Sequence, residues 1–152
     1  MANEDQSCWI TYNGEFYNFQ EYRQELEQSG HVFQSHCDTE TILHLYEEHG
    51  IEKTLSRMNG MFALGLWDNR QKTLILARDR VGKKPLYYAV KKGGIVFASE
   101  LKAIYASGLI DLGQLDEQAL AESLISGMPF HDRTMFSDIR ALPAGHYAIW
   151  KN

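Results

Sequence analysis

The sequence predicts an α+β domain in which antiparallel β-sheet lies between layers of helix. Apolar residues recur at helical spacing before residue 58, four strand-like segments occupy the middle of the chain, and two further helical segments follow them. Helices and strands grouped in this way favour a layered α+β arrangement. The 152 residues fit one domain by size, and neither a linker nor a repeat divides them.

Six segments are predicted to be strands because they are rich in aromatic and β-branched residues. They span residues 8–12, 61–67, 73–77, 86–90, 95–98 and 146–150. Asn13-Gly14 follows the first strand and predicts a turn, since both residues tolerate positive φ. The four central strands are joined by short turn signals, so they predict an antiparallel meander.

Helices are predicted where apolar residues fall on one face and a polar residue precedes the first turn. They span residues 19–28, 38–50, 51–58, 100–105 and 116–125. The predicted N-caps of three of them are Asn18, Asp38 and Asp116. Residues 127–143 are expected to be irregular.

Composition argues against several classes of function. A net charge of −5 disfavours a nucleic-acid partner, which would require a basic face. No apolar run approaches the roughly 18 residues of a membrane span, and the acidic, polar N-terminus does not resemble a signal peptide. Two cysteines, Cys8 and Cys37, do not form a disulfide framework. We therefore expect a cytoplasmic protein that binds neither nucleic acid nor membrane.

Metal and cofactor motifs are not evident either. The six histidines show no HxH or HExxH spacing, so the sequence predicts no metal site. No glycine-rich loop suited to phosphate is present, and no cofactor is predicted.

Asn13 and Gly14 are candidates for catalysis of acyl transfer. Attack on an amide carbonyl places negative charge on its oxygen, which a side-chain amide and a neighbouring backbone N–H can stabilise together. Glycine allows the backbone to approach a ligand closely, so the pair could form an oxyanion hole. For the isolated dipeptide, a plain Asn-Gly turn is the commoner explanation.

Two carboxylates are candidates for binding an amino-acid ligand. Asp38, at a helix start, could accept the ligand's cationic amine, or could simply cap the helix. Glu15 could help to hold the same amine, or could face solvent. The residues alone leave both alternatives open.

Longer motifs resemble those of class II glutamine amidotransferases, which are N-terminal-nucleophile hydrolases. Within that class the chain is most similar to the glutaminase domain of glutamine-hydrolysing asparagine synthetase. The resemblance extends from about Trp9 to Tyr147. The motifs concerned are Asn13-Gly14-Glu15, Tyr17-Asn18, Asp38-Thr39-Glu40, Gly60–Ala63, Arg78–Tyr88, Phe97–Ala103 and Leu142–Tyr147.

This resemblance implies an αββα sandwich of antiparallel sheets that hydrolyses glutamine and supplies ammonia for ATP-dependent asparagine synthesis in a second domain. By the same resemblance, Asn13 and Gly14 form the oxyanion hole, and Glu15 and Asp38 bind L-glutamine. The segment Arg78–Lys84 is implied to be a structural turn without a catalytic role.

The chain departs from the family at its start. The family begins Met-Cys-Gly-Ile and uses the cysteine as nucleophile, whereas this chain begins Met-Ala-Asn-Glu. Residues 1–152 are therefore expected to be a partial, N-terminally truncated glutaminase domain without the synthetase domain, and to be inactive alone. The expected partners are glutamine, a synthetase domain or an N-terminal segment, and a second copy through exposed sheet edges. Cys8 and Cys37 are interpreted as ordinary small residues and not as replacement nucleophiles.

Two alternatives remain. One is a nucleophile-free module that binds glutamine or another protein. The other is an amidotransferase of the same class with a sugar-phosphate or phosphoribosyl acceptor, which the segment Leu142–His146 disfavours. The sequence does not identify the ammonia acceptor, and a relative of β-lactam synthetase would share these residues.

Overall fold

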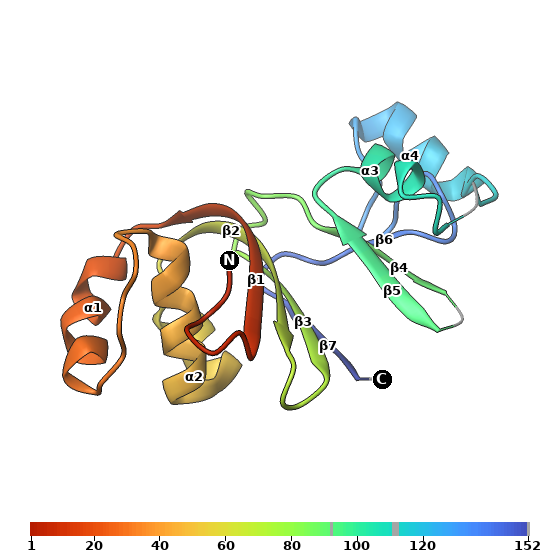
Figure 1. Ribbon diagram of the computed structural model, residues 1–152. Helices are drawn as coiled ribbons and strands as arrows, with labels where there is room; N and C mark the ends of the chain where they lie inside the picture. The colour runs from red at the N-terminus through yellow and green to blue at the C-terminus, as the bar shows by residue number, and fades with distance from the viewer. Residues whose placement is uncertain (92, 111–112, 152) are drawn as a thin grey trace.

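The computed structural model describes residues 1–91, 93–110 and 113–151 (Figure 1). In chain order its elements are β1 (Cys8–Phe16), α1 (Phe19–Gln28), α2 (Asp38–Arg57), β2 (Gly60–Asp68), β3 (Thr73–Arg78), β4 (Tyr87–Lys91), β5 (Gly94–Ala98), α3 (Leu101–Ala106), α4 (Glu117–Ser126), β6 (Arg140–Ala141) and β7 (Tyr147–Lys151). Among these described residues, no helix is both long and apolar enough to cross a membrane.

The described strands form two antiparallel sheets, not one meander. The first sheet has the order β1-β2-β3-β7, and the second has the order β5-β4-β6. The predicted meander is therefore wrong between β3 and β4, where the chain passes from one sheet to the other (Figure 1). Antiparallel strands and helices together confirm the α+β prediction.

Three apolar clusters define the layers. The first lies between α1, α2 and one face of the first sheet, and includes Leu26, Leu45 and Leu64. The second joins the two sheets face to face, and the third packs α3 against the far side of the second sheet. The second sheet can take part in two clusters because successive side chains of a strand point to opposite faces. In β5, Phe97 packs in the cluster between the sheets and Val96 packs in the cluster beneath α3. The result is an αββα sandwich.

Strand β1 continues through Asn13-Gly14 and ends at Phe16, so the predicted turn is wrong. Gly14 does not adopt positive φ. It pairs with Phe62 of β2, and a Cβ placed on Gly14 would lie 2.3 Å from the carbonyl oxygen of Met61. Close approach of two strands, and not a turn, is what requires glycine here.

The start of α2 differs from the prediction. Cys37 occupies the N-cap position without a capping hydrogen bond from its side chain, and Asp38 is the first helical residue and not the cap. The two helices predicted for this region form one continuous element with a kink at Gly50, where φ is 73°. Glycine adopts this left-handed conformation without steric cost, so the chain can change direction and resume the helix.

The other predicted N-caps are confirmed by position. Asp116 precedes α4 and its Oδ1 accepts a hydrogen bond from the Ala119 N–H at 2.9 Å. Asn18 precedes α1, but its side chain instead accepts from the Asn59 N–H and donates to the Arg57 carbonyl. Asn18 therefore links the start of α1 to the end of α2.

Arg78 and Asp79 hold the passage from the first sheet to the second. The Arg78 guanidinium donates to the carbonyl oxygens of Gly82, Lys84 and Leu142. Asp79 is fully buried, and its backbone N–H donates to the Phe62 carbonyl at 2.8 Å. These contacts are structural, in agreement with the turn expected for this segment.

Candidate functional site

Asn13 and Glu15 lie on one face of β1 and are exposed, whereas Tyr12 and Phe16 point to the opposite face and pack in the cluster with α2. The Asn13 Nδ2 donates to the Ser99 Oγ at 3.3 Å. Ser99 follows β5, so this hydrogen bond reaches from the first sheet to the second. The Asn13 amide therefore lies between the end of β5 and the first sheet.

A small hollow of about 220 Å³ adjoins Asn13 between the sheets. Gly65 and Phe97 are among its lining residues, and a Cβ on Gly65 would lie 2.4 Å from the Phe97 ring. Glycine at this position lets the aromatic ring close the interior side of the hollow. The volume is below the usual range for a drug-sized ligand, so the hollow suits a small molecule.

Gly14 presents its backbone N–H at the free edge of β1. The N–H and the carbonyl of its partner Phe62 both point away from β1. The Phe62 N–H donates to Asp79 Oδ2, and the Phe62 carbonyl accepts from the Asp79 N–H. Gly14 and Phe62 are therefore a non-hydrogen-bonded antiparallel pair, in which the Gly14 N–H points away from β2. Since β1 is the edge strand, that donor faces outward.

Asp38 lies at the same edge of β1. Its Oδ2 accepts a hydrogen bond from the Phe16 N–H at 2.9 Å. Phe16 is two residues beyond Gly14, so both N–H groups point to the same side of the strand, about 7 Å apart. The Asp38 carboxylate is thus joined to the strand end that carries Gly14 and Glu15, although it lies in a different element.

Both candidate carboxylates influence the hydroxyl of Tyr12 electrostatically. It is buried and has no hydrogen-bond partner among the described residues. Burial raises the pKa of Tyr12, and the negative charges of Asp38 and Glu15 raise it further. Asp38 and Glu15 therefore both act electrostatically on the same phenol at this strand end.

Glu40 positions the start of α2. It is buried, and it accepts hydrogen bonds from the backbone N–H groups of Gln34 and Ser35 and from the Ser35 hydroxyl. Burial alone would raise the pKa of Glu40, but these hydrogen bonds hold it below its usual value. The ionised carboxylate fixes the loop that leads into Asp38.

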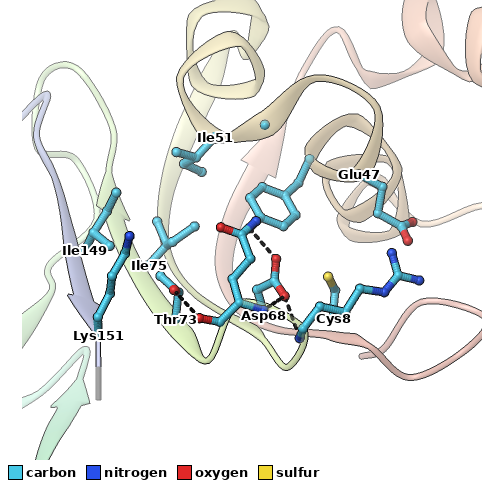
Figure 2. A pocket seen from close by; sticks show the side chains of 12 residues that line it. Cys8, Glu47, Ile51, Asp68, Thr73, Ile75, Ile149 and Lys151 are labelled. Atoms are coloured by element: carbon cyan, nitrogen blue, oxygen red, sulfur yellow. Dashed lines mark hydrogen bonds between the residues drawn. The ribbon is translucent and has the colours of Figure 1, made fainter.

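Neither thiol is arranged as an obvious nucleophile. Cys8 is 3% exposed, and burial together with the charge of Asp68 raises its pKa to about 11. It lines a separate hollow of about 430 Å³, where Figure 2 shows its thiol beside Asp68. Cys8 is at the start of β1 and Asn13 five residues further on, so that hollow is roughly 17 Å along the strand from Asn13. The Cys37 Sγ donates to Asp38 Oδ1 at 3.4 Å.

Sequence reasoning missed Tyr12 and Ser99. Tyr12 was assigned only to a strand, and no local pattern distinguishes a buried phenol under the influence of two carboxylates from an ordinary core tyrosine. Ser99 lies inside the motif Phe97–Ala103, which offered a signal, but its contact with Asn13 joins residues 86 positions apart.

Comparisons with known proteins identify the family to which the chain belongs. The family model described as "Glutamine amidotransferase domain" matches residues 1–152. Asparagine synthetase [glutamine-hydrolyzing] 2 of Bacillus subtilis (strain 168) is 38% identical over 151 residues, which cover 97% of this chain and 20% of that protein. Asparagine synthetase [glutamine-hydrolyzing] 3 of Arabidopsis thaliana is 47% identical over 105 residues, which cover 68% of this chain and 18% of that protein. The chain thus spans about a fifth of the length of these relatives.

Solved structures are similar in fold. The allosteric regulatory enzyme of purine biosynthesis aligns with a TM-score of 0.58 and 29% identity, covering 66% of this chain and 23% of that one. The glutamine phosphoribosylpyrophosphate amidotransferase of B. subtilis aligns with a TM-score of 0.58 over 99% of this chain and 30% of that one. Its 19% identity supports the fold alone. With a family model that matches the chain from end to end, these residues belong to the glutamine amidotransferase domain family.

Proposed function

We propose that residues 1–152 form the glutamine-binding part of a glutaminase site, which serves a longer protein by releasing ammonia from glutamine for asparagine synthesis. Family membership specifies glutamine as the amide donor. The names of the relatives support asparagine synthesis as the use of the ammonia, because several of them are glutamine-hydrolysing asparagine synthetases. Since the chain spans only a fifth of those proteins, the acceptor belongs to this proposal.

The observation that carries the proposal is the shared edge of β1. There the Gly14 N–H points outward, and the Asp38 carboxylate is fixed by the Phe16 N–H at 2.9 Å. The Gly14 N–H, a donor for an oxygen, and the Phe16 N–H, which holds the negative charge of Asp38, are about 7 Å apart on the same side of one strand. Glutamine extends over a comparable length between its side-chain carbonyl and its α-amine.

Each group has a defined role in this proposal. The Asn13 side-chain amide and the Gly14 N–H stabilise the oxyanion that forms when the glutamine amide is attacked. Asp38 and Glu15 bind the α-ammonium group of glutamine. The negative charges of both carboxylates raise the pKa of the buried Tyr12 hydroxyl, so it stays a neutral phenol at this strand end.

Residues 1–152 by themselves are expected to bind glutamine without hydrolysing it. The Cys8 thiol is buried with a pKa near 11, and the thiolate is the reactive form. The Cys37 thiol already donates to Asp38, a group assigned to substrate binding. Ammonia release by the purified chain that Cys37→Ser abolishes would contradict this assignment.

Isothermal titration calorimetry with L-glutamine tests the binding roles. Asp38→Asn retains an oxygen that can accept from the Phe16 N–H but loses the charge, so affinity should fall by roughly 10-fold to 100-fold, as for a lost charge-assisted hydrogen bond. Asn13→Ala should cause a smaller loss, since the oxyanion is absent from bound substrate. Asp132→Asn, a half-exposed aspartate in another part of the fold, serves as the matched control.

Two results would contradict the proposal. If the wild-type chain shows no binding heat at millimolar glutamine, it is not a glutamine-binding module. If Asp38→Asn and Asp132→Asn bind glutamine equally well, the start of α2 does not hold the amine.

A further inference from the structure

Glu4, His31 and His44 lie close together where the N-terminal segment packs against α2. They come from the N-terminal segment, the connection between α1 and α2, and α2 itself. Each offers one nitrogen or oxygen atom suited to a metal ion, and these atoms lie within 4.8 Å of one another. The Glu4 Oε2 is 3.9 Å from the His44 Nδ1. The other Glu4 oxygen accepts from the Val32 N–H at 3.2 Å, which holds this carboxylate in place.

His44 is almost completely buried, with a side chain 1% exposed. Its ring packs against the rings of Phe33 and His31, with centroids 4.5 and 4.7 Å away. Its Nε2 makes no hydrogen bond to any described residue. A buried polar nitrogen without a partner is unfavourable, and a small shift of the ring toward the Glu40 Oε1, 3.9 Å away, would let an Nε2–H donate to that carboxylate and leave Nδ1 free to bind a metal ion.

Both histidines place one ring nitrogen toward the cluster and the other toward a separate carboxylate. The Nδ1 atoms of His31 and His44 lie 3.9 and 3.2 Å from the Glu47 Oε2. On the opposite sides of the rings, the His31 Nε2 lies 3.4 Å from Glu48 and the His44 Nε2 lies 3.9 Å from Glu40. In metal-bound histidines an outer carboxylate accepts the second N–H and sets the tautomer. His31 already has that hydrogen bond with Glu48, whereas the His44 Nε2 faces Glu40 without being bonded to it.

The cluster also contains more negative than positive charge. The carboxylates around the two imidazoles are those of Glu4, Glu40, Glu47 and Glu48. Even two protonated histidines would leave the group net negative. A bound dication would offset the excess.

We propose that Glu4, His31 and His44 form a site for a divalent transition-metal ion of the Zn²⁺ type, which fastens the N-terminal segment to α2. Two imidazole nitrogens and a carboxylate oxygen are ligands that Zn²⁺ accepts. In a tetrahedral site with ligands at about 2.1 Å, the ligand atoms are about 3.4 Å apart, so atoms up to 4.8 Å apart must close by up to about 1.4 Å. The partly exposed Glu4 side chain can make that movement at the cost of its hydrogen bond from the Val32 N–H, and the Glu47 Oε2 is positioned as a fourth ligand.

Sequence spacing could not reveal this site. The three residues do not lie on one helix or in one short motif, and the prediction of no metal site rested on that absence. Only the packing of the N-terminal segment against α2 brings them together, with Asn3 donating to the Glu47 Oε1 at 2.6 Å.

Zn²⁺ titration of untagged, chelator-treated protein tests the proposal by thermal unfolding and calorimetry. At about 100 times the dissociation constant, Zn²⁺ should raise Tm by about 5–10 °C. Co²⁺ should give the intense visible absorption of a tetrahedral site without a thiolate charge-transfer band, because no cysteine takes part.

Variants identify the ligands. Glu4→Gln and His31→Gln replace partly exposed side chains and should each weaken Zn²⁺ affinity at least tenfold. His36→Gln is the matched control, since His36 is exposed in the same connection between the helices and should leave affinity unchanged. His44→Gln is included only if circular dichroism shows that it folds.

Three outcomes would overturn the proposal: no rise in Tm with Zn²⁺, an equal rise in wild type, Glu4→Gln and His31→Gln, or a thiolate band with Co²⁺. Glutamine binding is measured separately, so failure here leaves the proposed function untouched.

Discussion

Asp79 is predicted to be the side chain whose loss most weakens the connection between the sheets. It is fully buried, and among the described residues its carboxylate accepts hydrogen bonds from backbone N–H groups at 2.9–3.2 Å. The donors are Phe62, Val81, Lys83 and Lys84. The carboxylate thus joins β2 to the loop that enters β4.

Asp79→Asn keeps the shape of the side chain but leaves one accepting oxygen. The new amide NH₂ faces backbone donors, so two charge-assisted hydrogen bonds are lost. At about 1.5–3 kcal/mol each, the free energy of unfolding should fall by about 3–6 kcal/mol. This is a large share of the roughly 5–15 kcal/mol of a typical domain.

The effect should depend on pH in a defined direction. Burial would raise the pKa of Asp79, but the backbone N–H donors outweigh it and hold the pKa below its ordinary value. A carboxyl with a depressed folded pKa contributes stability above its unfolded pKa, about 3.9, and loses it as pH falls further. The loss caused by Asp79→Asn should therefore be full at pH 7 and shrink below about pH 4.

Urea unfolding, monitored by tryptophan fluorescence, measures the loss of unfolding free energy. Asp132→Asn serves as the control, because the Asp132 side chain is 44% exposed and lies 3.9 Å from Arg140. The control should change stability by no more than about 0.5 kcal/mol. The reasoning is refuted if Asp79→Asn costs less than about 1 kcal/mol at pH 7, or no more than the control.

Two further predictions concern the space between the sheets and the thiols. Gly65→Ala places a Cβ 2.4 Å from the Phe97 ring and should destabilise the fold by about 1–3 kcal/mol. The control Gly94→Ala meets no atom within 4 Å and should change Tm little. Equal melting temperatures of the two variants would contradict the close packing assigned to Gly65. In native protein at pH 8, iodoacetamide should modify Cys37 well before Cys8, because Cys8 is buried and its pKa is about 11. Peptide mass spectrometry measures the labelling of each cysteine. Equal labelling of the two would exclude the burial assigned to Cys8.

Local sequence was sufficient for several elements. The helix Phe19–Gln28 was predicted with the bounds that the structure has, and Asp116 caps α4 as expected. Helical periodicity and capping involve residues within a few positions of one another, so a single segment contains the whole signal.

The errors arose where distant contacts override a local preference. Asn13-Gly14 is compatible with a turn, but pairing with β2 over the full length of β1 keeps it extended. The alternating pattern of the central strands is the same whether they share a sheet or not, so it could not reveal that β3 and β4 separate. That separation depends on the buried contacts of Arg78 and Asp79.

In the candidate site, too, the sequence identified the residues and the tertiary contacts decided their surroundings. Asn13, Gly14, Glu15 and Asp38 were singled out from motifs, but their sequence left each open to an ordinary structural role. The structure removes the turn at Asn13-Gly14 and the capping role of Asp38. The functional roles of these residues stay predictions until glutamine binding is measured.

The sequence by itself determined the family, the α+β class and the type of most elements, because motifs and periodicity are properties of short segments. Only the tertiary structure decided which strands share a sheet, which way the Gly14 N–H points and which backbone group Asp38 binds. It alone also brought together Glu4, His31 and His44. All of these depend on contacts between residues far apart in the chain, and such contacts exist only once the apolar faces of the helices and sheets have packed together.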